Sequence, residues 1–331
     1  MAATIADDIE LVQHHNHEHI DPALISRPFA GRIGGNQQFT VSPENAEFDK
    51  ITAKAPDAAA NFSWKASLDL RGFSDTELWK QATIEGVGTG LQIYLSSLYS
   101  LGLFAALPET SLGPIVPAAL GSVTNAVLLP LFIYAGGPVS GGHFNPLITL
   151  STFFARLSTL PRTVLYVLFQ CTGSLCGSFL MRASLGRPPA ELIGIPGCYI
   201  NTALVSPGQA YVFETMAAFS LVFLAFGFGL DPRQRDVFGP ALSPILVGLA
   251  LGLCSFAAGF VKEGFSGASL NPARCFGLMA AAGTFKQDSA RRALIFWILE
   301  RFDYHYINWL GDLTAAMVNG LMYWCIPIYK D

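Results

Sequence analysis

The sequence contains one seven-residue pattern twice, and this repeat limits the possible folds more than any other feature. The copies occupy residues 140–146 and 266–272, and both read Ser-Gly-x-x-apolar-Asn-Pro. An Asn side chain can cap the N-terminus of a helix, and Pro fits the first helical turn because the N–H that it lacks would have no partner there. We therefore predict that one helix begins at Asn145 and another at Asn271.

Each of these helices is too short to cross a membrane. The apolar run from Asn145 to Phe154 has ten residues, which make about 15 Å of helix against about 30 Å for the hydrocarbon core of a bilayer. Two half-helices that enter from opposite faces would meet near the midplane, where broken helices are tolerated only if protein buries them or they line a wet cavity. One isolated Asn-Pro is usually a turn, whereas two matched copies favour a pair of half-helices.

The composition indicates a membrane protein. Of the 331 residues, 51% are hydrophobic and 13% are charged, whereas soluble domains carry about 25% charged residues. The mean hydropathy is +0.41. The net charge of −4 gives no support for nucleic-acid binding. No set of nucleophile, base and orienting group is apparent, so we expect no enzyme activity, no cofactor and no metal.

Six apolar segments are long enough to span a bilayer. They cover residues 79–106, 116–134, 163–181, 210–230, 242–260 and 307–329. Residues 1–76 lack periodicity and predict a mostly disordered N-terminal tail, whereas residues 77–331 predict one membrane domain with repeat halves at about 79–182 and 210–329. Solvation explains the histidines of the tail more simply than metal binding does; these are His14, His15, His17 and His19.

The two halves of the membrane domain repeat each other. Glu85 precedes Asn145 by 60 residues and Glu214 precedes Asn271 by 57, so each half carries one glutamate in its first span and one Asn-Pro later. Because each half has three spans, an odd number, the second half must be inverted relative to the first, which places a site at the midplane between them. The predicted fold is an all-α membrane bundle of six transmembrane helices plus two re-entrant half-helices.

The two motifs resemble the Asn-Pro-Ala boxes of the major intrinsic proteins, the superfamily of aquaporins and aquaglyceroporins. The first box reads Asn145-Pro146-Leu147, and the second reads Asn271-Pro272-Ala273 followed by Arg274-Cys275. A degenerate first box with a second box that continues into Arg-Cys resembles the X intrinsic protein subfamily in particular. The resemblance covers roughly residues 79–329.

This resemblance implies a passive channel for small uncharged solutes that excludes ions and protons. The solutes implied are glycerol, hydrogen peroxide, urea and boric acid, with water as a further candidate. It also implies a homotetramer with one pore per subunit, surrounded by membrane lipid. The lysines and arginines of the short loops do not show a positive-inside bias, so it is the resemblance that places the protein in the plasma membrane with both termini in the cytosol.

Alignment to the family around each motif implies a second constriction near the boxes. Its predicted lining is Asn125, Ser255, Ala268 and Arg274. A shift of the alignment by one helical turn would replace Ser255 with Gly259. Three of the four residues are small or moderately polar, and the bulky aromatic residue and the histidine of strict water channels are missing. We therefore expect an opening that admits solutes larger than water.

Several residues near the boxes allow more than one interpretation. Glu85 and Glu214 fit a structural role in which each carboxylate accepts hydrogen bonds from the irregular box loop of its own half. Leu147 either narrows the midplane or packs away from the pore. Cys275 is either a small packing residue or a reactive thiol, since the six cysteines show no disulfide framework. Asp312 is expected near the outer surface, where water can reach it.

Two other functions are compatible with the sequence. A proton-coupled secondary transporter would need a coupling-ion site and moving halves, and no paired acidic and basic set is apparent beyond the two symmetric glutamates. A closed pore that acts as a membrane sensor or scaffold through its long tail is the second alternative.

Overall fold

The computed structural model describes most of the chain, and the described residues are largely helical. They are residues 31–33, 41, 44–54, 56–59, 63–107, 113–186, 197–261, 263–282 and 304–325. Within these ranges the only pairing of β type is an isolated bridge between Val41 and Ala59. The predicted all-α membrane fold is confirmed.

The two halves contribute matching sets of helices. The first half contains α4 (Thr76–Ala106), α5 (Ile115–Ser140), α6 (Pro146–Phe154) and α7 (Leu160–Leu185). The second half contains α8 (Pro207–Ala225), α9 (Arg235–Gly259), α10 (Pro272–Ala281) and α12 (His305–Cys325). A π-helical turn over Phe226–Leu230 extends α8. Each predicted span therefore corresponds to one long helix, and each Asn-Pro opens one short helix.

Local sequence signals set several helix ends. The side chain of Asp75 caps α4, and Ser206 forms a capping box with Gln209 at the start of α8. At the other ends, α5 stops at Gly141, with φ of 89°, and α7 stops at Gly186, with φ of 60°. Glycine suits these stops because the left-handed backbone strains other residues.

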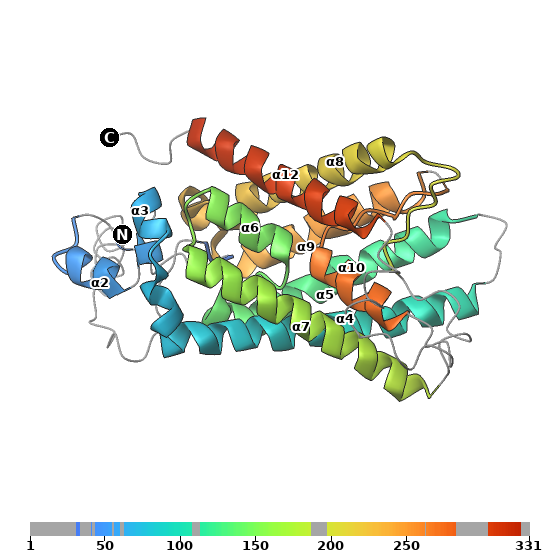
Figure 1. Cartoon of the computed structure of the whole chain (residues 1–331), viewed down its shortest axis with the longest axis horizontal. Helices are drawn as coiled ribbons and strands as arrows, with labels where there is room; N and C mark the ends of the chain where they lie inside the picture. Colours follow the sequence, from blue (N-terminus) through green and yellow to red (C-terminus); the bar gives the residue numbers. More distant parts are fainter. Residues whose placement is uncertain are drawn as a thin grey trace, which may run out of the picture.

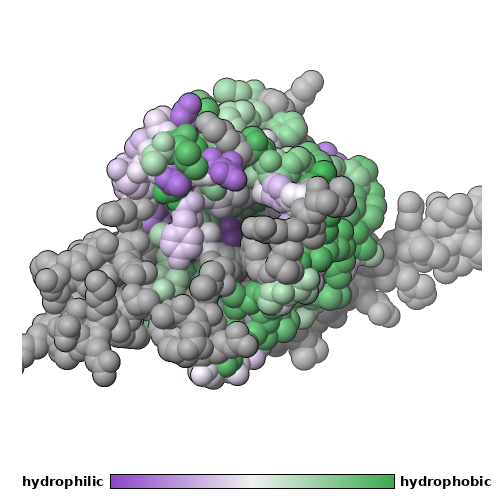
Figure 2. All heavy atoms as spheres, turned by 90° about the vertical axis from the view of Figure 1, so that its right-hand side faces the viewer, coloured by the Kyte–Doolittle hydropathy of each residue, from purple (hydrophilic) through white to green (hydrophobic). Residues whose placement is uncertain are grey.

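The long helices differ in polarity. By length and composition alone, four described segments could cross a membrane: α5, α7, α8 with its π-helical turn, and Val237–Gly259 of α9. Helices α4 and α12 are of similar length but bury polar side chains, among them Glu85 and Asp312. Figure 2 shows one end of the molecule, where hydrophilic residues gather on the end face and hydrophobic residues form the flank.

The long helices pack in pairs that the repeat relates. Helix α4 packs on α7, α8 packs on α12, and α5 packs on α9. The contact of α4 with α7 depends on glycine, since a Cβ on Gly177 would lie 2.2 Å from the carbonyl oxygen of Gly90. The two short helices lie within the bundle, with α6 and α10 in opposite halves of its length (Figure 1).

The described part of the N-terminal segment is folded onto one end of the bundle. It includes the short helices α2 (Phe48–Lys54) and α3 (Trp64–Ser67). Asp57 forms a buried ion pair with Arg162 of α7, with 2.8 Å between Oδ2 and Nε. The indole of Trp64 lies 5.1 Å from that of Trp324 at the end of α12, measured between ring centroids.

The described residues before residue 76 therefore include folded segments, whereas the expectation of a mostly disordered tail over residues 1–76 stays a prediction. Short helices leave little periodicity in a sequence, and a buried arginine requires a partner that only the fold reveals. The four tail histidines lie outside the described residues.

Candidate functional site

The two Asn-Pro motifs act as helix caps in the structure. The side-chain oxygen of Asn145 accepts a hydrogen bond from the N–H of Leu147 at 2.9 Å, at the start of α6. The side-chain oxygen of Asn271 accepts one from the N–H of Arg274 at 3.3 Å, at the start of α10. Pro146 is the first residue of α6, as Pro272 is of α10.

Each asparagine also binds the loop of the other half. The Nδ2 of Asn145 donates to the carbonyl oxygen of Leu270 at 2.6 Å, and the Nδ2 of Asn271 donates to that of Phe144 at 3.0 Å. Phe144 and Leu270 have left-handed backbones, with φ of 48° and 52°. The structure therefore brings the N-termini of the two half-helices together, with one amide hydrogen of each asparagine engaged across the junction.

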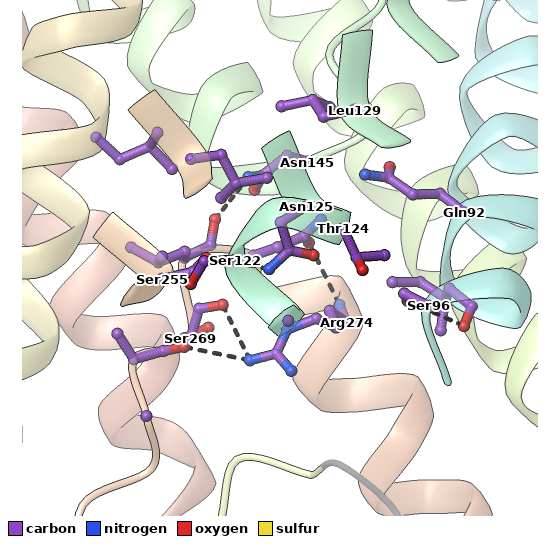
Figure 3. Close-up of a pocket in the computed structure, with 18 of the residues that line it drawn as sticks. Gln92, Ser96, Ser122, Thr124, Asn125, Leu129, Asn145, Ser255, Ser269 and Arg274 are labelled. Atoms are coloured by element: carbon purple, nitrogen blue, oxygen red, sulfur yellow. Dashed lines mark hydrogen bonds between the residues drawn. The ribbon is translucent and has the colours of Figure 1, made fainter. Parts of the chain in front are cut away.

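A cavity of about 310 Å³ runs past this junction. Both asparagines line it, together with residues of α4, α5, α9 and the two box loops. All four residues of the predicted constriction also line it: Asn125, Ser255, Ala268 and Arg274. Figure 3 shows Asn125 and Ser255 beside each other, with Arg274 and Ser269 nearby.

The constriction residues contact one another or the same loop. The Nδ2 of Asn125 donates to the Oγ of Ser255 at 3.1 Å. The Nη2 of Arg274 donates to the carbonyl oxygens of Ala268 at 3.2 Å and Ser269 at 3.3 Å. Of the two candidates in the fifth span, Ser255 lines the cavity beside Asn125. Gly259 packs on α5 instead, because a Cβ there would lie 3.0 Å from that of Ala118.

The third residue of each box packs away from the cavity. Leu147 is fully buried in the main apolar cluster, and Ala273 is fully buried as well. The next residue, Ile148, does line the cavity. The larger side chain of the first box is thus absorbed by packing.

Glu85 supports the first box loop. Its carboxylate accepts hydrogen bonds from the Oγ of Ser140 at 2.6 Å, the backbone N–H of His143 at 3.0 Å and the Nε2 of Gln170 at 2.8 Å. The N–H of Phe144 also donates to it. The loop groups that lipid would leave unpaired are satisfied in this way.

Glu214 has the same relation to the second box loop, with fewer partners. Its carboxylate accepts from the backbone N–H of Ser269 at 2.7 Å and from the hydroxyl of Ser266. The Oγ of Ser269 also donates to Asp312 at 3.4 Å. Asp312 is fully buried, which corrects the expectation that water can reach it, because its neighbours are the box loop and α8.

A disulfide links Cys198 to Cys275, with 5.2 Å between the Cα atoms. Cys275 is therefore not the reactive thiol that the sequence left possible. The bond holds the segment around Cys198 against Arg274, whose Nη2 lies 3.1 Å from the Cys198 sulfur. Because the two cysteines are 77 residues apart, their spacing gave no sign of the pairing.

Away from Arg274, the cavity is lined by an N-terminal segment that no sequence motif indicates. Ile33 lines the cavity together with Leu129 and Val247. We call residues 31–33 the N-terminal strap. No motif marks them, and only the tertiary structure brings them to this site.

Comparison with known proteins identifies the family. The model of the major intrinsic proteins matches residues 72–323. This chain belongs to the major intrinsic protein family. It is accordingly an integral membrane channel for small solutes and not an enzyme.

Curated relatives and a solved structure agree with this assignment. The chain is 33% identical to "Probable aquaporin TIP4-1" of Oryza sativa subsp. japonica, over 68% of this chain and 79% of the relative. It is 32% identical to "Probable aquaporin PIP2-8" of Arabidopsis thaliana, over 76% of this chain and 82% of the relative. The aquaglyceroporin from Plasmodium falciparum has a similar fold, with a TM-score of 0.56 at 17% identity over 74% of this chain and 95% of that one.

Proposed function

We propose that this channel passes small uncharged solutes and excludes ions and protons. The candidate solutes are glycerol, hydrogen peroxide, urea and boric acid, with water as a further candidate. The observation that carries the proposal is the junction of two helix N-termini at the cavity, each capped by an asparagine that lines it.

The electrostatics of the junction favour neutral solutes. A helix N-terminus carries roughly half a positive charge, so α6 and α10 together present a positive field to the cavity. A cation meets this field as a barrier. Water molecules that pass the junction turn their oxygens toward it, which interrupts the chain of hydrogen bonds along which a proton would move. The guanidinium of Arg274 adds a second positive group to the cavity lining.

The constriction favours solutes larger than water. Its other three members are Asn125, Ser255 and Ala268, none of them aromatic. Hydroxyl and amide groups of this kind replace the hydrogen bonds of a polar solute as it leaves water.

We further propose membership of the X intrinsic protein subfamily, a homotetramer and a plasma-membrane location with both termini in the cytosol. The Asn-Pro-Leu first box and the Asn-Pro-Ala-Arg-Cys second box support the subfamily. The contact between Trp64 and Trp324 supports the topology, because it places α3 and the end of α12 at the same end of the bundle.

A proton-coupled transporter is less well supported. Glu85 and Glu214 are the symmetric acids that such a mechanism would use, and both hold the box loops through hydrogen bonds. Movement of a coupling proton on and off either one would disturb the loop that it supports.

Stopped-flow swelling of proteoliposomes tests the channel proposal. We expect glycerol or hydrogen peroxide to enter at rates proportional to concentration without a proton leak, and the Arg274→Ala variant to admit protons or larger solutes several-fold faster. The same swelling assay is applied to the full chain and to variants of the N-terminal strap. Saturable uptake that follows a proton gradient would contradict a channel.

A further inference from the structure

The strap is anchored on both sides of the segment that the first box loop and α6 form together. The N–H of Gly31 donates to the carbonyl oxygen of Leu157, just after α6, at 3.0 Å. The N–H of Ile33 donates to that of Gly141, at the end of α5, at 3.1 Å. Two backbone hydrogen bonds therefore fix the strap across this loop.

The strap also binds the box loop directly. The carbonyl oxygen of Gly31 lies 2.6 Å from the Nε2 of His143, which lines the cavity two residues before Asn145. A carbonyl can only accept, so this nitrogen carries the hydrogen. The other ring nitrogen lies 3.1 Å from the Oγ1 of Thr149. The strap thus takes the Nε2 hydrogen bond of a side chain that lines the cavity.

Arg32 binds the end of α5. Its side chain is fully buried, and its Nη1 and Nη2 donate to the carbonyl oxygens of Pro138 at 3.1 Å and Val139 at 3.3 Å. The last carbonyls of a helix lack partners within the helix and carry partial negative charge, which suits a cation. Burial lowers the pKa of Arg32 to about 10, so the side chain stays charged at neutral pH.

Ile33 reaches across to the second half of the bundle. Its side chain is 3% exposed. A Cβ added to Gly229 would lie 3.0 Å from the Cγ2 of Ile33 and 3.0 Å from the Cγ2 of Val247, so the three residues pack together. Ile33 belongs to the apolar cluster that contains Leu129 and Leu221, both of which line the cavity. The strap therefore runs from Gly141 in the first half to the neighbours of α8 and α9 in the second.

We propose that the strap is an autoinhibitory plug that closes the end of the pore opposite Arg274 and must leave for solute to pass. This inference rests on the proposed channel function. The side chain of Ile33 offers no hydrogen bond to replace those that a solute gives up, and an apolar constriction of this kind excludes water. Removal of the strap would leave the polar groups of His143 and of the end of α5 to water, so the bound strap is the resting arrangement.

Arg32→Ala tests the plug, because it removes the hydrogen bonds from the guanidinium to Pro138 and Val139 and leaves the residues that line the cavity unchanged. We expect wild-type proteoliposomes to pass glycerol slowly and the variant to pass it at least about tenfold faster, since hydrogen bonds from a charged group are among the stronger ones. The matched control is Arg71→Ala. Arg71 belongs to the same N-terminal segment but pairs with Asp69 at the surface, so its removal leaves the flux unchanged.

A disulfide cross-link tests the plug in a second way, and its result does not depend on whether the Arg32→Ala variant folds. Cysteines introduced as Ile33→Cys and Gly229→Cys are placed to cross-link the strap to the second half. The oxidised double variant should pass no more glycerol than wild type. After reduction, its glycerol flux should exceed that of wild type treated with the same reductant, because the reduced variant lacks the branched side chain of Ile33.

The outcomes separate the two proposals. Equal, fast flux in wild type, Arg32→Ala and the cross-linked protein contradicts the plug and leaves the channel intact. Absence of flux for every solute in all variants, with the protein folded, contradicts the channel and with it the plug.

Discussion

The two box loops are built on one plan but are held in place differently. Both present an asparagine cap, and both rest on a buried glutamate. The first loop gives Glu85 three hydrogen-bond partners, to which α7 adds Gln170, and it also binds the N-terminal strap. The second gives Glu214 two of the described bonds and is tied by the disulfide at Cys275. The two halves thus share one geometry, which the first half holds with hydrogen bonds and the second with fewer described hydrogen bonds and a disulfide.

This difference assigns separate tasks to the two ends of the pore. The disulfide fixes the loop that carries Arg274, so the charge barrier keeps its position. Contacts of the strap are all noncovalent and can be released without breaking either box. On the proposed plug mechanism, the opening of one end of the pore would leave the position of Arg274 at the other end unchanged.

The largest effect is expected from removal of the loop-supporting glutamates. Glu85→Leu leaves the N–H of His143 and other buried donors unpaired, at about 1–3 kcal/mol for each, so we expect little folded protein. Glu214→Leu should do less damage because the disulfide still holds its loop. Thermal unfolding in detergent measures both, with Glu77→Gln, at a half-exposed side chain in the first turn of α4, as the control. Equal losses in the two variants would show that the disulfide adds nothing to the second loop.

A smaller effect is expected from Leu147→Ala, which makes the third residue of the first box match that of the second. Because Leu147 is fully buried away from the cavity, the change should destabilise the protein by about 2–5 kcal/mol. The ratio of glycerol to water permeability should not change. Leu91→Ala on the exposed face of α4 is the control, and an altered ratio at unchanged stability would place Leu147 in the pore.

The smallest effect is expected from Cys198→Ser, which frees the second loop from its tether. A lost disulfide costs about 2–4 kcal/mol. In the unfolded variant Cys275 should react with a maleimide as a fifth free thiol, in addition to the four cysteines that are free in the wild type. Arg274 should also lose its fixed position, which lowers the discrimination between solutes. Cys176→Ser, at an exposed free cysteine, is the control. Unchanged melting and selectivity would mean that hydrogen bonds alone position Arg274.

The sequence predicted the parts of the site that local patterns encode. The two Asn-Pro starts, the short length of the helices that follow and the symmetric glutamates are all visible in the residues themselves. The constriction around Asn125 and Ser255 needed alignment to a family, because only the three-dimensional arrangement joins α5 to α9.

What the sequence could not supply depends on contacts between distant segments. Cys198 and Cys275 are separated by 77 residues, and nothing near either one indicates a partner. The strap is three described residues without periodicity, and its role follows from where Gly141 and Val247 lie. Asp312 was expected near water because a carboxylate usually requires it, yet the fold buries it beside Ser269.

The crossed bonds of Asn145 and Asn271 have a consequence for biogenesis. Each asparagine is satisfied by a carbonyl of the opposite half, so the half that leaves the ribosome first carries an incomplete loop until the other has been inserted. Neither half is finished alone, and a truncated chain would expose unpaired amide groups that membrane quality control can recognise.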